Sequence, residues 1–467
     1  MTKRARMIGF AAVIAGLGFS GAVANAQSAE PPDLRKKVEA LEEEVRQLRS
    51  ERAISPAYSI RDVDAVVAAV QADANGRSVA IPHGGSAGHE LGKGFYIRSD
   101  DGNFTLYPDL FVQFRGIVNY REDGKRGSES TTESGFELRR AKIGFSGTAF
   151  SPDLTYRFLW QDAVTGGGLS LQYGYAQYVF AHGVAGGDLA VRAGQFKNIV
   201  FKEEFTPDRA QLFAERSLAN ALLGGAALGS ETQGVDVLLI GADNPVHVDV
   251  LFDDGIRSSN TDFRDNQPVT VGTTTTNVAT NFGVAGRVDY KIFGRWRDAD
   301  DLTGTAGRED LLVVGGGVDF SQGDNNSTVH YTADVQYQLH RKLVLLAAVY
   351  GNEVDLRNTS GSSSRSDWGV QVEAGYFITP ALQAIARYSL VKFDGDFKTG
   401  GEDTFHEISG GLNWFFGKDG ELGNRAKLTL DVNYLPNGSP SVPGLDYLAS
   451  PNKRDEVVIR TQLQFSL

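Results

Sequence analysis

Four basic residues between positions 194 and 229 are the clearest candidates for a functional site in this sequence. They are Lys197, Lys202, Arg209 and Arg216. Arginine presents a planar, permanently charged fork that fits phosphate and carboxylate oxygens, and lysine adds a compact positive charge. In a narrow pore, a ring of such side chains replaces the water that an anion sheds. These residue types therefore predict an anion-binding constriction.

The same stretch also predicts a helix. Asp208 is a candidate N-cap, good helix formers run from Arg209 to Leu223, and the pair Gly224–Gly225 is a stop signal. A surface loop with one helix is the simpler alternative. Because the flanking segments alternate with period two, and because counting strands makes this stretch the third connection on the long-loop side, we expect a loop that folds back into a pore.

Strands must position these residues, and most of the sequence consists of short runs in which apolar and polar residues alternate. In the clearest run, 328–339, Val329 and Tyr331 share one face while His330 and Asp334 share the other. A soluble antiparallel sheet also alternates, but rarely over so many segments. The even number of segments is typical of an outer-membrane barrel. About sixteen such runs begin near residues 104, 136, 153, 169, 188, 230, 246, 281, 311, 328, 342, 367, 381, 404, 425 and 456.

The spacers between these runs alternate in length, as expected for periplasmic turns and external loops. The tight ones lie at 151–152, 242–245, 340–341 and 379–380. The long ones cover 121–135, 199–229, 254–280, 352–366, 394–403 and 436–455. Two spacers depart from this order, because 293–310 is long where a turn is due and 321–327 is short where a loop is due. This irregularity suggests one misassigned strand. The fold class predicted is an all-β, transmembrane, antiparallel barrel of about 16 strands.

Composition excludes several classes of protein. The net charge is −12, which argues against a nucleic-acid partner. The chain has no cysteine, which rules out disulfides, thiolate metal sites and a cysteine nucleophile. None of the seven histidines is spaced as an obvious metal pair, so neither a metal nor a cofactor is expected. The sequence at 84–88 matches a nucleophile-elbow pattern, but no strand is predicted before it and no helix after it.

The N-terminal region divides into three expected parts. Residues 1–26 read as a signal peptide, with basic residues before an apolar core and a small-residue cleavage site at 24–26; a membrane anchor is the alternative. Residues 27–55 carry a heptad pattern that predicts a short periplasmic coiled coil, or else a solvated amphipathic helix. Residues 56–93 form a glycine-rich linker, and residues 94–467 form the barrel. The heptad positions are Leu34, Val38, Leu41, Val45 and Leu48.

Three blocks of sequence carry a resemblance to a known family. They are the blocks 136–144 (FELRRAKIG), 194–197 (GQFK) and 215–218 (ERSL). In this order and spacing they resemble the phosphate- and polyphosphate-selective porin O/P family. The resemblance implies a sixteen-stranded, trimeric outer-membrane channel with an inward-folded third loop. It also implies an anion-binding constriction, to which these residues carry over: Arg139, Arg140 and Arg216, with Lys197 and Arg209 as weaker neighbours.

The sequence departs from the family at two positions. Glu203 and Glu204 stand where members with a strong phosphate site have a lysine, and Thr155 stands at a further basic position. Acidic neighbours such as Glu215 moderate the field of the arginines in one interpretation. In the other, they pair with the arginines and abolish selectivity.

The pair Arg139 and Arg140 poses a geometric problem. Adjacent strand residues point to opposite faces, so both can face the lumen only where a bulge re-aims one of them. Arg140 lies two residues before Lys142 and so on the same face of the strand, which makes Arg140 the better candidate to face the lumen. Arg139 is then expected near the barrel end or on a bulge. A structural ion pair with carboxylates of the third loop is the alternative role for both.

Together these patterns predict a porin of the Gram-negative outer membrane that passes small solutes by diffusion and prefers anions such as phosphate. The expected surroundings are outer-membrane lipid, two further copies in a homotrimer, and a cell-wall contact through the periplasmic coiled coil. No catalysis is expected. The alternatives are a general unselective porin, a structural envelope tether and, less favoured, an outer-membrane barrel enzyme, for which the sequence offers no catalytic constellation.

Overall fold

The computed structural model describes residues 43, 84–90, 94–121, 131–162, 168–225, 230–255, 266–271, 274–305, 309–323, 326–358, 361–395, 402–440, 447 and 455–467. The chain divides into two compact units, Met1–Arg77 and Ser78–Leu467. In the first unit, Glu43 is described and is helical. The predicted signal peptide, the rest of the predicted coiled coil and most of the linker lie outside the described residues.

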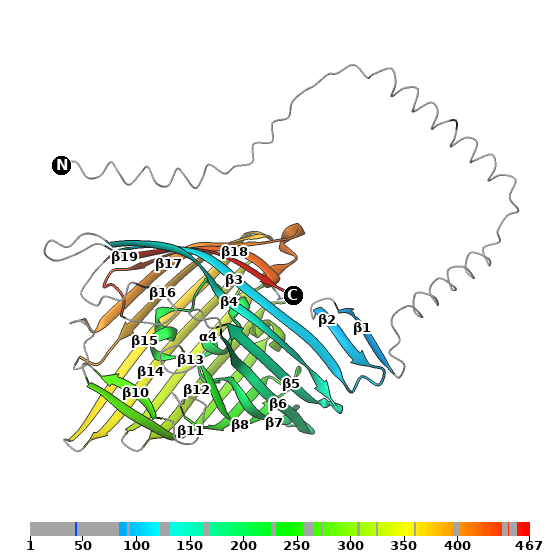
Figure 1. The fold of residues 1–467 in the computed structure, drawn as a ribbon, viewed down its shortest axis with the longest axis horizontal. Coiled ribbons are helices and arrows are strands. Elements are labelled where there is room, and N and C mark those ends of the chain that lie inside the picture. The colour runs from blue at the N-terminus through cyan, green and yellow to red at the C-terminus, as the bar shows by residue number, and fades with distance from the viewer. Residues whose placement is uncertain are drawn as a thin grey trace, which may run out of the picture. The chain divides into compact units, whose positions relative to one another are not determined.

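The described strands of the second unit form a closed antiparallel barrel of sixteen strands (Figure 1). Pairing of β19 with β3 closes the ring, and β9 pairs with β11 across a long spacer. The barrel strands are β3 (Thr105–Arg121), β4 (Thr131–Ala149), β5 (Ser151–Asp162), β6 (Leu169–Val184), β7 (Gly187–Lys197), β8 (Glu231–Ile240), β9 (Val246–Asp253), β11 (Thr274–Phe293), β12 (Leu311–Gly323), β13 (Asn326–Leu339), β14 (Leu343–Asn358), β15 (Gly361–Thr379), β16 (Leu382–Lys392), β17 (Thr404–Phe415), β18 (Ala426–Leu435) and β19 (Glu456–Ser466).

Two short hairpins extend this sheet. Strand β10 (Asn266–Val271) pairs with the first part of β11, and β1 (Gly85–Glu90) pairs with β2 (Gly94–Ser99). The second hairpin corrects one expectation, because part of the glycine-rich segment assigned to a linker is a strand. Gly88 permits this pairing, since a Cβ there would lie 2.8 Å from the Tyr96 hydroxyl.

Side chains on the barrel strands are arranged opposite to those of a soluble protein. On β3, the outward Phe114 is 47% exposed, whereas the inward Arg115 is 0% exposed. The same alternation continues around the ring, with apolar Ile143, Val237 and Val288 exposed on the outside. An apolar outer band around a polar interior is the pattern that a barrel needs in lipid. Among the described helices, none has the length and apolar character required to cross a membrane.

The periodicity located the barrel strands correctly, including those on either side of the two irregular spacers. Each predicted run corresponds to one barrel strand, so no strand is misassigned around 293–327. Instead, the spacer after β11 carries α6 (Trp296–Ala299) and folds inward. The lumen-facing Gln338 holds it there, donating from Nε2 to the carbonyl oxygen of Asp301 at 2.6 Å. Leu302 N donates to Ala210 O at 3.0 Å, which joins this segment to the long spacer after β7.

That long spacer, residues 198–230, is here called loop 3. Its described residues, 198–225 and 230, lie within the ring of strands (Figure 1). It contains α4 (Lys202–Phe205), the 3-10 turn η1 (Asp208–Ala210) and α5 (Leu218–Leu223). Two strands near the C-terminus bind its backbone, since Lys427 Nζ donates to Gln211 O at 2.6 Å and Gln464 Nε2 donates to Arg209 O at 3.0 Å. Loop 3 is thus the inward-folded third loop that the sequence predicted.

The helix predicted in loop 3 is shorter than expected. It begins at Leu218 rather than Arg209, and its cap is Ser217, whose Oγ accepts from Asn220 N at 3.1 Å. Lumen side chains compete for the preceding backbone donors, as Ala214 N donates to Asp431 Oδ2 at 3.0 Å. The segment before α5 therefore satisfies its backbone against the barrel wall rather than within a helix.

An apolar cluster inside the barrel fixes α5 against strands β14–β16. Leu218, Leu223 and Phe201 of loop 3 are buried there with Tyr350 of β14. Gly369 on β15 allows the close approach, since a Cβ at that position would lie 3.0 Å from a Leu223 methyl carbon. Loop 3 consequently has a permanent attachment on one side of the lumen, which leaves its basic residues facing the other side.

Candidate functional site

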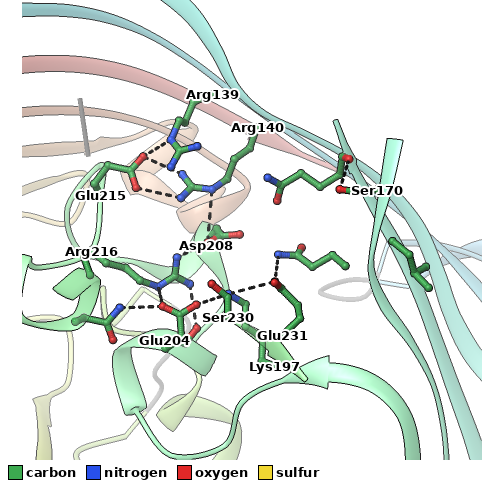
Figure 2. Close-up of a pocket in the computed structure, with 15 residues that line it drawn as sticks. Arg139, Arg140, Ser170, Lys197, Glu204, Asp208, Glu215, Arg216, Ser230 and Glu231 are labelled. Carbon is green, nitrogen blue, oxygen red and sulfur yellow. Dashed lines mark hydrogen bonds and ion pairs between the residues drawn. The ribbon is translucent and has the colours of Figure 1, made fainter. Parts of the chain in front are cut away.

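Four of the five basic residues singled out from the sequence line one cavity between loop 3 and the barrel wall. Arg139 and Arg140 come from β4, Lys197 from the end of β7 and Arg216 from loop 3, and the cavity measures about 220 Å³ (Figure 2). It lies toward the long-loop end of the barrel, because the end of β5 and the start of β6 also border it. We call it the upper cavity.

A β-bulge directs both strand arginines inward. Gln113 of β3 pairs with Arg140 and the next residue, Phe114, pairs with Leu138, so Arg139 is the extra residue. Figure 2 shows both guanidinium groups reaching the same carboxylate, that of Glu215 in loop 3. The structure therefore has the bulge that the sequence required for both side chains to face the lumen.

Glu215 is the centre of this ion-pair network. Arg139 Nε lies 2.5 Å from its Oε1, Arg140 Nη2 lies 3.1 Å from its Oε2, and Arg115 Nη1 lies 2.6 Å from its Oε1. Burial alone would raise the pKa of the Glu215 carboxyl, but Arg139, Arg140 and Arg115 hold that pKa well below its usual value. Glu215 is thus ionised and ties loop 3 to two barrel strands.

Arg216 braces loop 3 internally as well as facing the cavity. Its Nη1 lies 2.7 Å from Asp208 Oδ1, and its Nε lies 3.3 Å from Glu204 Oε2. It also donates to three backbone carbonyl oxygens of the same loop, those of Glu203, Glu204 and Thr206. Such a fully bound guanidinium fixes the curvature of loop 3 and adds a permanent charge to the cavity wall.

The other carboxylates of the cavity are also paired. Glu204 Oε1 lies 2.5 Å from Lys197 Nζ, and Asp208 binds Lys142 of β4. Burial alone would raise the pKa of Glu204, but Arg216 and Lys197 lower it to about 2. The pKa of Asp208 is likewise well below its usual value, since Lys142 and its basic neighbours outweigh the effect of burial. Both carboxylates are ionised.

Two residues considered from the sequence lie elsewhere. Arg209 does not border the upper cavity; its side chain is 40% exposed, with Asp109 Oδ1 at 3.5 Å. Glu203 faces away from the cavity, accepting from Ser217 N at 2.8 Å and from Ser217 Oγ at 2.6 Å. Only one of the two consecutive glutamates, Glu204, therefore acts on the cavity.

Sequence reasoning missed Arg115 and Asp208 as members of this network. Arg115 lies at a lumen position of β3 by alternation with Phe114, so its phase was visible in the sequence, but its partner across the lumen was not. Asp208 was considered as a helix cap, and its three basic partners come from β4 and loop 3. No sequence signal brings these segments together except the inward fold of the loop itself.

The charges that line the upper cavity are balanced among the described residues. The cationic side chains are Arg139, Arg140, Lys197 and Arg216. The carboxylates are Glu204, Asp208, Glu215 and Glu231. The lining therefore carries no net charge from these side chains. In the described part of the chain, no group of acidic residues and histidines could hold a metal ion.

Comparisons with known proteins agree with this architecture. The family profile "Phosphate-selective porin O and P" matches residues 118–285. The resemblance to phosphate-selective porins is confirmed. The matched region contains the β4 bulge, the end of β7 and all of loop 3, so it covers the upper cavity. No curated protein matches the sequence.

Solved structures show the same fold at low identity. An anion-selective porin from Comamonas acidovorans is 11% identical, with a TM-score of 0.53 over 78% of this chain and 100% of that one. OmpF of Salmonella typhi, in complex with daunomycin, is 15% identical, with a TM-score of 0.50 over 78% of this chain and 98% of that one. At such identity the likeness concerns the barrel fold. The family match and this fold together indicate an outer-membrane channel of the Gram-negative type.

Proposed function

We propose that the channel passes small solutes by passive diffusion and prefers anions of the phosphate type. The observation that carries this proposal is the meeting of four basic side chains from β4, β7 and loop 3 on one cavity wall. Arginine forks can replace part of the hydration shell of an anion. The ion pairs keep these groups in place, and the carboxylates keep binding weak enough for release.

The structural similarity to a porin described as anion-selective supports the same preference; the description itself belongs to that porin. By the resemblance to the porin family, we further propose a homotrimer in outer-membrane lipid. We also propose that the segment before the barrel is periplasmic and that its coiled coil contacts the cell wall. The channel performs no catalysis in this proposal.

A general, unselective porin is the second candidate, and one observation favours it. The upper cavity holds as many carboxylates as basic groups, and the ion pairs within it satisfy arginines and a lysine that would otherwise attract anions. The two functions differ in the ion selectivity that remains once these charges are paired: a preference for anions in the first, and none in the second. A structural tether or a barrel enzyme has no comparable support.

The decisive measurement is the reversal potential of the purified channel in planar bilayers under a KCl gradient. The test variant is Arg140→Gln, and the control is Arg98→Gln, which changes an arginine of the β2 hairpin outside the lumen. Anion preference in the wild type that falls in Arg140→Gln and persists in the control supports the proposal. An unselective wild type, unchanged by Arg140→Gln, would leave the general porin. A folded protein without conductance would favour the tether, and turnover of lipid or peptide would favour the enzyme.

A further inference from the structure

A second cavity lies on the other side of loop 3, toward the tight turns, and measures about 440 Å³. We call it the lower cavity. Ile240 at the end of β8 and His247 near the start of β9 border it, as does Trp296 of the inward segment after β11. Lys197 lines both cavities, so the two lie in series along the same wall. Small-molecule sites typically measure about 300–1,000 Å³, so the lower cavity has sufficient volume for an organic solute.

The lining of the lower cavity carries excess positive charge among the described residues. Its basic side chains are Arg157, Arg192, Lys197, Lys202, Arg287 and Arg297. Its carboxylates are Asp249, Asp289 and Asp300. Because some of these cations are paired, as Arg287 is with Asp289 at 2.6 Å, the excess charge alone does not identify a site. The environment of Lys202 provides the evidence for a site.

Lys202, the first residue of α4, is a buried cation that faces the lower cavity. It is only 5% exposed, yet within the described residues its ammonium group makes no hydrogen bond or ion pair. Nζ lies 4.9 Å from the centroid of the Phe205 ring, which Arg287 Cζ also approaches at 5.0 Å. Asp300 on the facing segment also lines the cavity; burial raises its pKa and the charge of Lys202 lowers it, but within the described residues no ion pair joins the two side chains. An ammonium group that opens onto a cavity without a hydrogen-bond acceptor from the described protein is stabilised by an anionic ligand.

Aromatic rings also line the lower cavity. Arg192 Cζ lies 4.1 Å from the Phe196 ring centroid and Arg157 Cζ lies 4.8 Å from that of Tyr173. Trp296 closes the side toward the tight turns; its Nε1 donates to Asn244 O at 2.6 Å, which fixes the ring. The upper cavity has no aromatic residue in its described lining. A strongly hydrated inorganic anion gains little from ring surfaces, whereas a carboxylate attached to a ring can use both features.

We propose that the lower cavity is a binding site for small aromatic carboxylates, with Lys202 bound to the carboxylate and Phe205 and Trp296 against the ring. This inference goes beyond the proposed anion preference of the upper cavity and does not require it. In this proposal, a solute that has passed loop 3 reaches the lower cavity next. The cavity would therefore retain such solutes longer than it retains chloride, acetate or phosphate.

The test uses benzoate as the probe, with acetate for the charge alone and benzyl alcohol for the ring alone. Each is titrated against the chloride current of the full-length channel in planar bilayers, on each side of the membrane in turn. Benzoate should reduce the current at about one tenth of the acetate concentration, which corresponds to about 1.4 kcal/mol, and benzyl alcohol should have little effect. Equal potency of benzoate, acetate and phosphate would overturn the proposed ligand class.

Variants then assign the site. Lys202→Met should raise the half-blocking benzoate concentration about tenfold, because a hydrogen bond to a charged group is lost. The control is Lys392→Met, which removes a lysine paired with Asp403 at the long-loop end of β16. Phe205→Leu should abolish the difference between benzoate and acetate. If Lys202→Met does not fold, Lys202→Gln is used in its place. Block by benzoate that is unaffected by both Lys202 and Phe205 variants would place the binding elsewhere and refute the proposal.

This outcome is separable from that of the proposed function. An unselective reversal potential in KCl, together with benzoate block that depends on Lys202, would refute the anion preference of the upper cavity and retain the lower site. Anion preference without discrimination between benzoate and acetate would do the reverse.

Discussion

The two cavities on either side of loop 3 use the same residue types in opposite ways. In the upper cavity, basic groups and carboxylates are equal in number and bind each other at short distances, as in the three arginines around Glu215. In the lower cavity, basic groups outnumber the lining carboxylates, and Arg157 and Arg192 pair with carboxylates outside the lining. The Lys202 ammonium forms no hydrogen bond or ion pair within the described residues and lies against the Phe205 ring. The comparison teaches that a count of arginines and lysines in a sequence does not predict anion binding. What matters is which of them the fold leaves uncompensated.

The strongest way to break this contrast is to remove the central carboxylate of the upper cavity. Glu215→Gln leaves Arg115, Arg139 and Arg140 without their shared anion, and breaking a buried pair of this kind costs about 3–5 kcal/mol. We expect a marked rise in anion selectivity and a noisier current, since loop 3 also loses its tie to β3 and β4. Reversal potential and single-channel recordings measure both effects.

Glu137→Gln is the matched control, because Glu137 is partly exposed and, within the described residues, pairs with Arg115 and with no second arginine or lysine. Unchanged selectivity in Glu215→Gln would show that the arginines do not face the conducting path.

A second change tests Arg216 as the internal brace of loop 3. Arg216→Met removes two ion pairs and three hydrogen bonds to backbone carbonyl oxygens, so local opening of the loop should become at least about tenfold more frequent. Proteinase K digestion of the detergent-solubilised barrel measures this opening as cleavage within loop 3. Arg209→Met, which affects a half-exposed arginine of the same loop, should digest like the wild type. Equal resistance of both variants would contradict the bracing role.

A third, smaller change sharpens the description of the lower cavity. Gln338→Leu removes the donor that binds the carbonyl oxygens of Asp301 and Asp298, so the segment carrying Trp296 loses part of its support. Each such bond contributes about 0.5–1.5 kcal/mol, so the half-blocking benzoate concentration should rise about fivefold while KCl selectivity stays constant. Gln322→Leu, at the exposed end of β12, is the control. A change in selectivity without a change in benzoate block would contradict this division of roles.

The smallest expected effect concerns pH. The pKa of Glu204 is about 2, and those of Asp208 and Glu215 lie well below their usual values. A carboxyl group whose pKa is lowered by folding stabilises the fold above its unfolded pKa, and that contribution disappears only as the pH falls through the lowered value. The difference in reversal potential between wild type and Glu215→Gln should therefore be the same at pH 7 and pH 4.5. A difference that halves near pH 4.5 would indicate an ordinary pKa for Glu215.

Most of the barrel could be predicted because each strand residue reports its face. Alternation located all sixteen barrel strands but not β1 or β10, and the phase argument for Arg139 and Arg140 led to the bulge that the structure contains. Loop 3 was predicted by its position and its basic residues. These features are local, since a strand in lipid needs apolar residues on one face whatever its neighbours are.

The contacts inside the barrel could not be predicted in the same way. The helix expected from Arg209 began only at Leu218, because Asp431 and Glu407 of distant strands bind backbone donors that a helix would have used. The spacer 294–310 suggested a misassigned strand, whereas it folds inward onto Gln338 and loop 3. In both cases the deciding partner lies over 30 residues away, so no local pattern contains the information.

The bond from Gln464 to loop 3 has a consequence for the order in which the molecule is made. Gln464 lies on β19, the last strand, and donates to the backbone of Arg209 in the middle of the chain. The same strand forms the seam with β3 that completes the ring. The backbone of Arg209 can gain this hydrogen bond only when β19 is in place. The final seating of this part of loop 3 therefore waits for the last strand, which also completes the ring.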